Sequence, residues 1–153
     1  MLSLVPLTVV MSAVCAVLFV IDIRSHRLPN ALVYPLYPVT VIGLALSALL
    51  THQAPWGTAV LGMLLWGGVL AALHLLSGGR GMGMGDVKLG PVLGAVTGWL
   101  GTAAAATGLM AAFVLGGLWA LGCMLGGRSR RSTIAFGPFL ILGWIVGLCV
   151  GTG

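Results

Sequence analysis

Long apolar runs fill the chain from end to end, and each is interrupted by a short group of polar or turn-forming residues. A helix needs about 20 apolar residues to cross the hydrocarbon core of a bilayer, and most of these runs approach that length. The pattern therefore predicts an all-α fold with about six transmembrane helices. We expect these helices at residues 2–21, 31–50, 58–76, 87–100, 102–125 and 134–150.

The composition strengthens the membrane assignment. Hydrophobic residues make up 59% of the 153 residues and charged residues 6%, with a mean hydropathy of +1.17. Soluble domains carry roughly 25% charged residues. We therefore expect residues 1–153 to form a single domain embedded in the lipid bilayer. The first apolar segment lacks the basic flank and the small-residue cleavage site of a signal peptide, so we interpret it as a retained helix.

The basic residues indicate an orientation in the membrane. All seven lie near the connections that follow the first, third and fifth expected helices: Arg24, Arg27, Arg80, Lys88, Arg128, Arg130 and Arg131. Because Lys and Arg accumulate in cytoplasmic loops, the pattern predicts a multi-pass protein of the cell membrane with both termini outside the cytoplasm. Cations divided among three loops form no continuous basic face, so nucleic acid is not an expected partner.

The cysteine and histidine residues give no sign of a metal or redox site. Cys15, Cys123 and Cys149 lie on three separate expected helices, and the sequence contains no C-x-x-C pair. We therefore expect neither a metal site nor a cofactor. His74 lies within the third expected helix, and we interpret it as a packing residue in preference to a ligand or a catalyst.

Acidic side chains occur at two positions, Asp22 and Asp86. Both lie at the edge of an apolar run, where a charge is costly and a functional role is the first hypothesis. In the predicted topology Asp22 ends the first helix and Asp86 begins the fourth on the same cytoplasmic side, so the two can meet. Adjacent carboxylates share one proton and offer an acid and a base together. Such a pair can activate water for amide hydrolysis.

A glycine-rich segment, SGGRGMGMGD at residues 77–86, leads into the second acid. Its alternating glycines, Gly83 and Gly85 among them, allow another backbone to approach closely, which a protease needs to hold an extended peptide beside its carboxylates. A phosphate-binding loop is the competing interpretation, but its G-K-[ST] ending is missing. A plain flexible linker is the remaining alternative.

Three segments of the sequence resemble the type IV prepilin peptidases. The segment GMGDVKL at residues 83–89 resembles the G-x-G-D signature of that family. The segments IDIR at 21–24 and LPN at 28–30 resemble its first catalytic segment, and AFGPF at 135–139 resembles its F-G-P-F segment. The segments follow the expected order, so the resemblance extends over most of the chain.

This resemblance implies a membrane aspartyl endopeptidase that removes the leader peptide from prepilin or pilin-like preproteins at the cytoplasmic face of the membrane. Asp22 and Asp86 would be its catalytic pair. The candidate substrate-binding residues are Gly83, Gly85, Lys88 and Arg24. For Lys88 the alternative is a cation that only sets topology. Larger members resemble this core but carry paired C-x-x-C motifs linked to methylation of the new N-terminus, so cleavage without methylation is expected here.

Two other functions remain open. A small proton-coupled transporter would use the acids as a relay and should show broken helices or an internal repeat, which the sequence does not display. A non-catalytic assembly protein of a pilus or secretion machine would not need the acids. Glycines at a spacing of four, at 90, 94 and 98 and at 143, 147 and 151, give flat helix faces for close packing. We favour contacts within the chain over dimer contacts, and the oligomeric state stays open.

Overall fold

The computed structural model describes residues 2–25, 30–78, 83–126 and 136–152, and the elements in these ranges are helical. A single 3-10 turn, η1 (Leu2–Leu4), precedes the first α-helix. The helices are α1 (Val5–Ser25), α2 (Asn30–Thr51), α3 (Trp56–Leu76), α4 (Met84–Leu100), α5 (Thr102–Leu125) and α6 (Gly137–Thr152). The all-α prediction is confirmed, and the expected boundaries agree to within a few residues. The expected start of the last helix, residue 134, lies outside the described residues.

Four of the helices are long and apolar enough to cross a membrane, namely α1, α2, α3 and α5. Helix α6 is apolar but shorter. Helix α4 has 17 residues and begins at Met84, three residues before the expected start at 87. The acid that the sequence places at the edge of this helix, Asp86, therefore belongs to its first turn.

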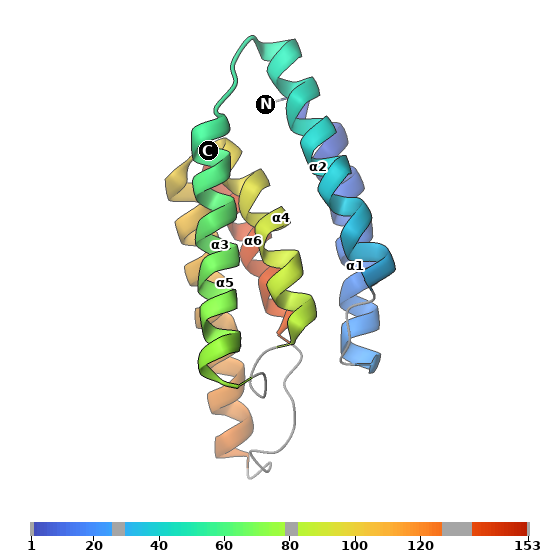
Figure 1. The fold of residues 1–153 in the computed structure, drawn as a ribbon. Coiled ribbons are helices and arrows are strands. Elements are labelled where there is room, and N and C mark those ends of the chain that lie inside the picture. The colour runs from blue at the N-terminus through green and yellow to red at the C-terminus, as the bar shows by residue number, and fades with distance from the viewer. Residues whose placement is uncertain (1, 26–29, 79–82, 127–135, 153) are drawn as a thin grey trace.

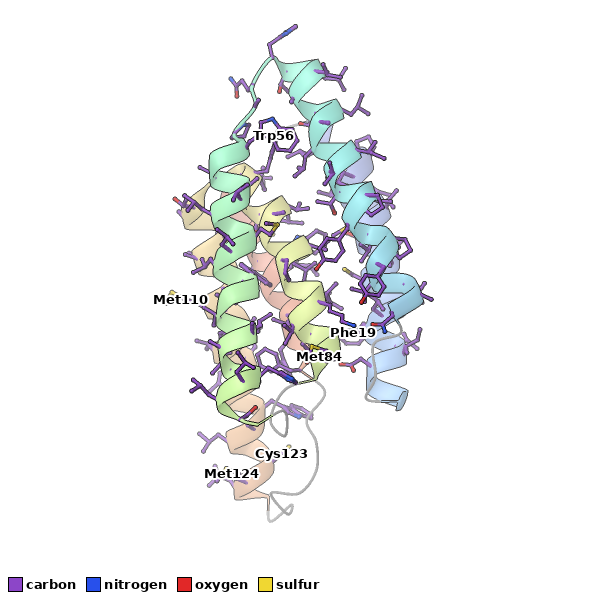
Figure 2. The ribbon with its side chains drawn as sticks, in the orientation of Figure 1. Phe19, Trp56, Met84, Met110, Cys123 and Met124 are labelled. Atoms are coloured by element: carbon purple, nitrogen blue, oxygen red, sulfur yellow. The ribbon has the colours of Figure 1, made fainter. Side chains whose placement is uncertain are left out.

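The helices form two groups (Figure 1). Helices α1 and α2 lie side by side as one pair, and α3 to α6 form the second group, in which α4 is the helix that faces α2. The last turn of α1 and the first turns of α4 and α6 lie at one end of the molecule, and both chain termini lie at the other. In Figure 2, Phe19 and Met84 mark the first of these ends and Trp56 marks the second.

Glycines allow α4 to pack closely against α3. A side-chain Cβ at Gly94 would collide with the carbonyl oxygen of Gly62, and one at Gly98 would lie 3.0 Å from the Cα of Gly62. Helices α5 and α6 are packed in the same way, since a Cβ at Gly143 of α6 would lie 2.6 Å from the Cβ of Ala112 of α5. Small residues are the usual means of close helix approach in membranes. These rows thus make contacts within the chain, as expected.

A buried tryptophan ties the second group together. Trp66 of α3 is fully buried, and its indole N–H donates a hydrogen bond of 2.8 Å to the carbonyl oxygen of Ala105 on α5. Helix α4 lies among the others, and most of its length is buried. A helix that is apolar around its whole circumference is suited to this central place. The packing fixes α4 and, with it, the acid in its first turn.

Candidate active site

The two acidic side chains occupy matching places on different helices. Asp22 lies in the last turn of α1, and Asp86 is the third residue of α4. Both are buried, with 4% of Asp22 and 5% of Asp86 exposed. Burial of a carboxylate is costly unless a partner or a shared proton compensates for the lost water. Their burial therefore indicates a chemical role, because a carboxylate that only made the surface soluble would be exposed.

The first residue of α6 brings the two carboxyl groups together. A Cβ built on Gly137 would lie 2.6 Å from Oδ2 of Asp22 and 3.4 Å from Oδ1 of Asp86. The two oxygens are therefore at most 6.0 Å apart, close enough to share a proton directly or through a single water. The place beside Gly137 is open only because glycine has no side chain. Helices α1, α4 and α6 thus meet at one carboxylate pair.

The second acid is also held by the start of its own helix. Gly83 is the N-cap residue of α4, and its backbone N–H donates a hydrogen bond to the carboxylate of Asp86. An acid at the third helical position that bonds back to the N-cap N–H is one half of a capping box. The oxygen Oδ1 of Asp86 has no hydrogen-bond partner among the described residues and faces Gly137. One oxygen of Asp86 is therefore held by the helix start, and the other faces the place beside Gly137 that Asp22 also faces.

The aromatic residues around Gly137 explain how the start of α6 is placed. The ring of Phe136 packs at 5.4 Å from that of Phe113 on α5 and at 6.2 Å from that of Phe139. A Cβ at Gly116 of α5 would lie 2.7 Å from the ring of Phe136, so the missing side chain makes room for it. Such rings bury much apolar surface and restrict each other's position. They hold Gly137 in place beside the two carboxyl groups.

The predicted substrate-binding residues have different surroundings. Gly83 is exposed beside Asp86, and Gly85 is half-buried in the same turn. Lys88 does not stand alone, because its ammonium donates a hydrogen bond of 3.0 Å to Oδ1 of Asn30 on α2. Arg24 belongs to the last turn of α1, and its side chain lies outside the described part of the chain. The remaining cations, Arg27, Arg80, Arg128, Arg130 and Arg131, also lie outside the described residues.

Sequence reasoning did not assign a role to Gly137 or to Asn30. Both belong to segments that resemble family motifs, F-G-P-F and L-P-N, so a signal existed at each position. Their contacts join helices far apart in sequence, and no local pattern predicts such contacts. The cysteines lie on α1, α5 and α6 as expected, and His74 lies in the last turn of α3.

These features define a class, a helical membrane protein with a buried pair of carboxylates at one end of its bundle. Comparison with protein families narrows the class. The chain belongs to the type IV leader peptidase family, whose model matches residues 9–121. The match includes both acids and the glycine-rich segment. No solved structure matches the chain.

Curated relatives agree with this family. The chain is 38% identical over 132 residues to the prepilin leader peptidase/N-methyltransferase of Aeromonas salmonicida, covering 82% of the chain and 43% of that protein. It is 36% identical to the protein of the same name from Xanthomonas campestris, over 90% of the chain and 48% of that protein. For the one from Escherichia coli the identity is 34%, over 86% of the chain and 57% of that protein. The chain thus spans about half the length of these relatives.

Proposed function

We propose that this chain is a membrane aspartyl endopeptidase that cleaves the leader peptide from prepilin or pilin-like preproteins, with Asp22 and Asp86 as the catalytic pair. One observation carries the proposal: an oxygen of each buried carboxylate lies within 3.4 Å of a single point beside Gly137. Membership of the leader peptidase family and the names of the relatives support the class of substrate.

The pair would act as acid and base in turn. One carboxyl group holds the shared proton while the other is ionised. The ionised group removes a proton from the water between them, and the water oxygen attacks the carbonyl carbon of the scissile bond as the protonated group donates to the carbonyl oxygen. When the tetrahedral intermediate collapses, one of its hydroxyl groups returns a proton to the ionised carboxylate, the C–N bond breaks, and the leaving amine takes up the proton of the other carboxyl group. The pair then holds one proton again.

The exposed start of α4 offers backbone to an extended peptide. Gly83 is exposed and has no side chain, so a substrate strand can approach the backbone next to Asp86. Gly85 and Arg24 complete this set of candidate substrate-binding residues, one in the same turn and one two residues after Asp22 on α1. For Lys88, contact with α2 favours a different role.

We further propose that the end bearing the carboxylates faces the cytoplasm and that both termini lie outside it. The distribution of Lys and Arg in the sequence supports this orientation. A single membrane-embedded domain over residues 1–153 fits the packing of α4 against helices of both groups. The chain has no C-x-x-C pair, which supports cleavage without N-methylation.

Purified protein in proteoliposomes tests the proposal. The substrate is a model preprotein with a short basic leader before an apolar helix, and mass spectrometry of its N-terminus reports the cleavage. Asp22→Asn and Asp86→Asn should each lower kcat by about 10⁴-fold or more, because members of a catalytic unit fail together. Both variants should remain folded, since Asn has the same shape and adds no buried charge. The control variant Ser47→Ala, at the end of α2 that lies far from the carboxylates, should cleave normally.

Other outcomes identify the other functions. Cleavage by either Asn variant at the normal rate would exclude the carboxylate pair as the catalyst. An inactive wild type that still carries protons across the vesicle membrane would favour a transporter, and one that does neither would favour an assembly role. Transfer of a methyl group from S-adenosylmethionine to the processed substrate would contradict cleavage without methylation.

A further inference from the structure

Three side chains of α2 contact Lys88 of α4. The ammonium of Lys88 donates a hydrogen bond of 3.0 Å to Oδ1 of Asn30 and lies 5.0 Å from the centre of the Tyr34 ring. The hydroxyl of Tyr37 donates a hydrogen bond of 2.7 Å to the carbonyl oxygen of Lys88. We call these four residues the α2–α4 clasp. The clasp holds both the side chain and the backbone of one residue, two positions after Asp86.

The start of α4 is weak as an isolated helix. Its N-cap, Gly83, has no side chain to cap the first backbone N–H groups. Gly85 and Gly90 are poor helix formers, and Pro91 lacks the N–H that would bond the carbonyl of Val87. Apart from the bond between the Gly83 N–H and the Asp86 carboxylate, the helix itself therefore gives these turns little support. Contacts from outside the helix must define where this segment lies.

The clasp also joins the two groups of helices. Helix α2 pairs with α1, which carries the first acid, and Thr40 of α2 donates a hydrogen bond of 3.7 Å to the sulfur of Met11 on α1. Helix α4 carries the second acid and belongs to the other group (Figure 1). A shift of α4 along α2 therefore changes the separation of the two carboxyl groups. The clasp lies on the α2 side of α4, where it resists such a shift.

We propose that Lys88 and Tyr37 are positioning residues that fix α4 on α2 and thereby set the separation of the Asp22 and Asp86 carboxyl groups. This inference rests on the proposed peptidase function and gives the lysine of the G-x-G-D segment a role other than substrate binding. Lys88 acts through Asn30 and Tyr34 rather than on the substrate. The two tyrosines differ in what they contribute, since Tyr34 offers its ring and Tyr37 its hydroxyl.

The tyrosines provide a matched pair of variants for steady-state cleavage assays. Tyr37→Phe removes the hydrogen bond to the Lys88 carbonyl, whereas Tyr34→Phe keeps the ring beneath the ammonium. Tyr37→Phe and Lys88→Met should lower kcat about 10-fold with little change in KM, because small displacements of reacting groups are costly. Tyr34→Phe should match the wild type. Lys88→Arg keeps a cation and a donor, so it should restore most of the lost kcat.

Asn30→Leu tests whether Lys88 acts through its partner. The double variant Lys88→Met/Asn30→Leu should be no slower than Lys88→Met alone, because that substitution already removes the contact with Asn30. Equal losses in Tyr34→Phe and Tyr37→Phe, or additive losses in the double variant, would contradict the clasp. A rise in KM with unchanged kcat for Lys88→Met would return this lysine to substrate binding.

A measurement without substrate separates the clasp from the peptidase function. Spin labels on Met84→Cys in α4 and Val41→Cys in α2, both at exposed positions, report the distance between the helices after the three native cysteines are replaced by Ala. The distance distribution should broaden in Lys88→Met and stay narrow in Lys88→Arg. An unchanged distribution would overturn the clasp even if the wild type cleaves prepilin. A broadened distribution in a protein that cleaves nothing would support the clasp and contradict the peptidase.

Discussion

Gly137→Ala adds one methyl group at the place where the two carboxyl groups meet. The added Cβ would lie 2.6 Å from Oδ2 of Asp22 and 3.2 Å from its Cγ, and 3.4 Å from Oδ1 of Asp86. The first of these distances is shorter than real contacts allow, whereas the last is ordinary contact. The substitution therefore displaces the first acid while leaving the second almost in place. It tests the geometry of the pair without removing either carboxyl group.

The size of the effect follows from this displacement. To regain ordinary contact with the new methyl group, the Asp22 oxygen must retreat by close to 1 Å, and a misplacement of this size costs about 100-fold in rate. The methyl group also occupies space in which the attacking water would sit. We expect kcat to fall by roughly 100-fold, equivalent to about 2.7 kcal/mol in the activation barrier, with KM little changed.

Matched glycine variants make this prediction specific. Gly117 on α5 and Gly68 on α3 have nothing within 4 Å of a built Cβ. Gly117→Ala and Gly68→Ala should cleave at the normal rate and be slightly more stable, because Ala is the better helix former by about 1 kcal/mol. The assay is steady-state cleavage in proteoliposomes, with thermal unfolding of each variant measured in parallel.

The result that would refute the reasoning is equally specific. If Gly137→Ala is folded and its kcat lies within threefold of the wild type, the carboxyl groups do not react at the place where the structure brings them together. If kcat falls but the unfolding midpoint falls with it, a second measurement at a lower temperature, where the variant is folded, separates misfolding from displacement. Only a loss of kcat in a folded protein supports the pair.

Three further predictions concern the pair and its support. The cleavage rate should depend on pH as a bell-shaped curve, because the pair of Asp22 and Asp86 needs one proton. Activity is lost at low pH when both are protonated and at high pH when neither is. A rate that only rises with pH would contradict the shared proton. Gly94→Ala should lower stability by about 1–3 kcal/mol and thus the unfolding midpoint, since its Cβ would lie 2.8 Å from the Trp66 Cβ and collide with the Gly62 carbonyl; an unchanged midpoint would refute close α3–α4 packing. Trp66→Phe loses the hydrogen bond to Ala105 and some packing volume, so unfolding should become easier by roughly 2 kcal/mol, measured by denaturant titration; a neutral effect would show that this bond does not stabilise the bundle.

The helices were predictable because the bilayer imposes one simple pattern. An apolar run of the required length has few alternatives to a membrane helix, since every backbone N–H and C=O must be satisfied within it. The exceptions are the last turn of α1, Asp22 to Ser25, and the first turn of α4, where Gly85 and Asp86 look like a loop when hydropathy alone sets the boundary. A hydrogen bond from the Gly83 N–H to the Asp86 carboxylate lies at the start of α4. It is made by polar groups, and polar groups lower the hydropathy from which a membrane helix is predicted.

The candidate acids were predictable from scarcity, but their surroundings were not. Two carboxylates in an apolar chain are conspicuous, and the topology brings them to one end. The third part of the site, Gly137, contributes by the absence of a side chain, and nothing in composition or periodicity distinguishes it from the packing glycines at 143 and 147. The partner of Lys88 is Asn30, which lies 58 residues away in the sequence. From the sequence alone, this lysine is therefore interpreted as a cation that sets the membrane topology.

The central helix combines poor intrinsic helix propensity with the most demanding position in the site. Helix α4 contains Gly85, Gly90, Gly94, Gly98 and Pro91, each of which weakens an isolated helix. Gly90, Gly94 and Gly98 let α3 approach on one side, and the clasp with α2 holds the other side, so the surroundings supply the order that the helix itself lacks. A helix of leucine and alanine would form more readily but could not bring α3 this close or leave room beside the acid. The position of Asp86 is therefore a property of the whole bundle, and substitutions far from the carboxyl groups should act on kcat whenever they move α4.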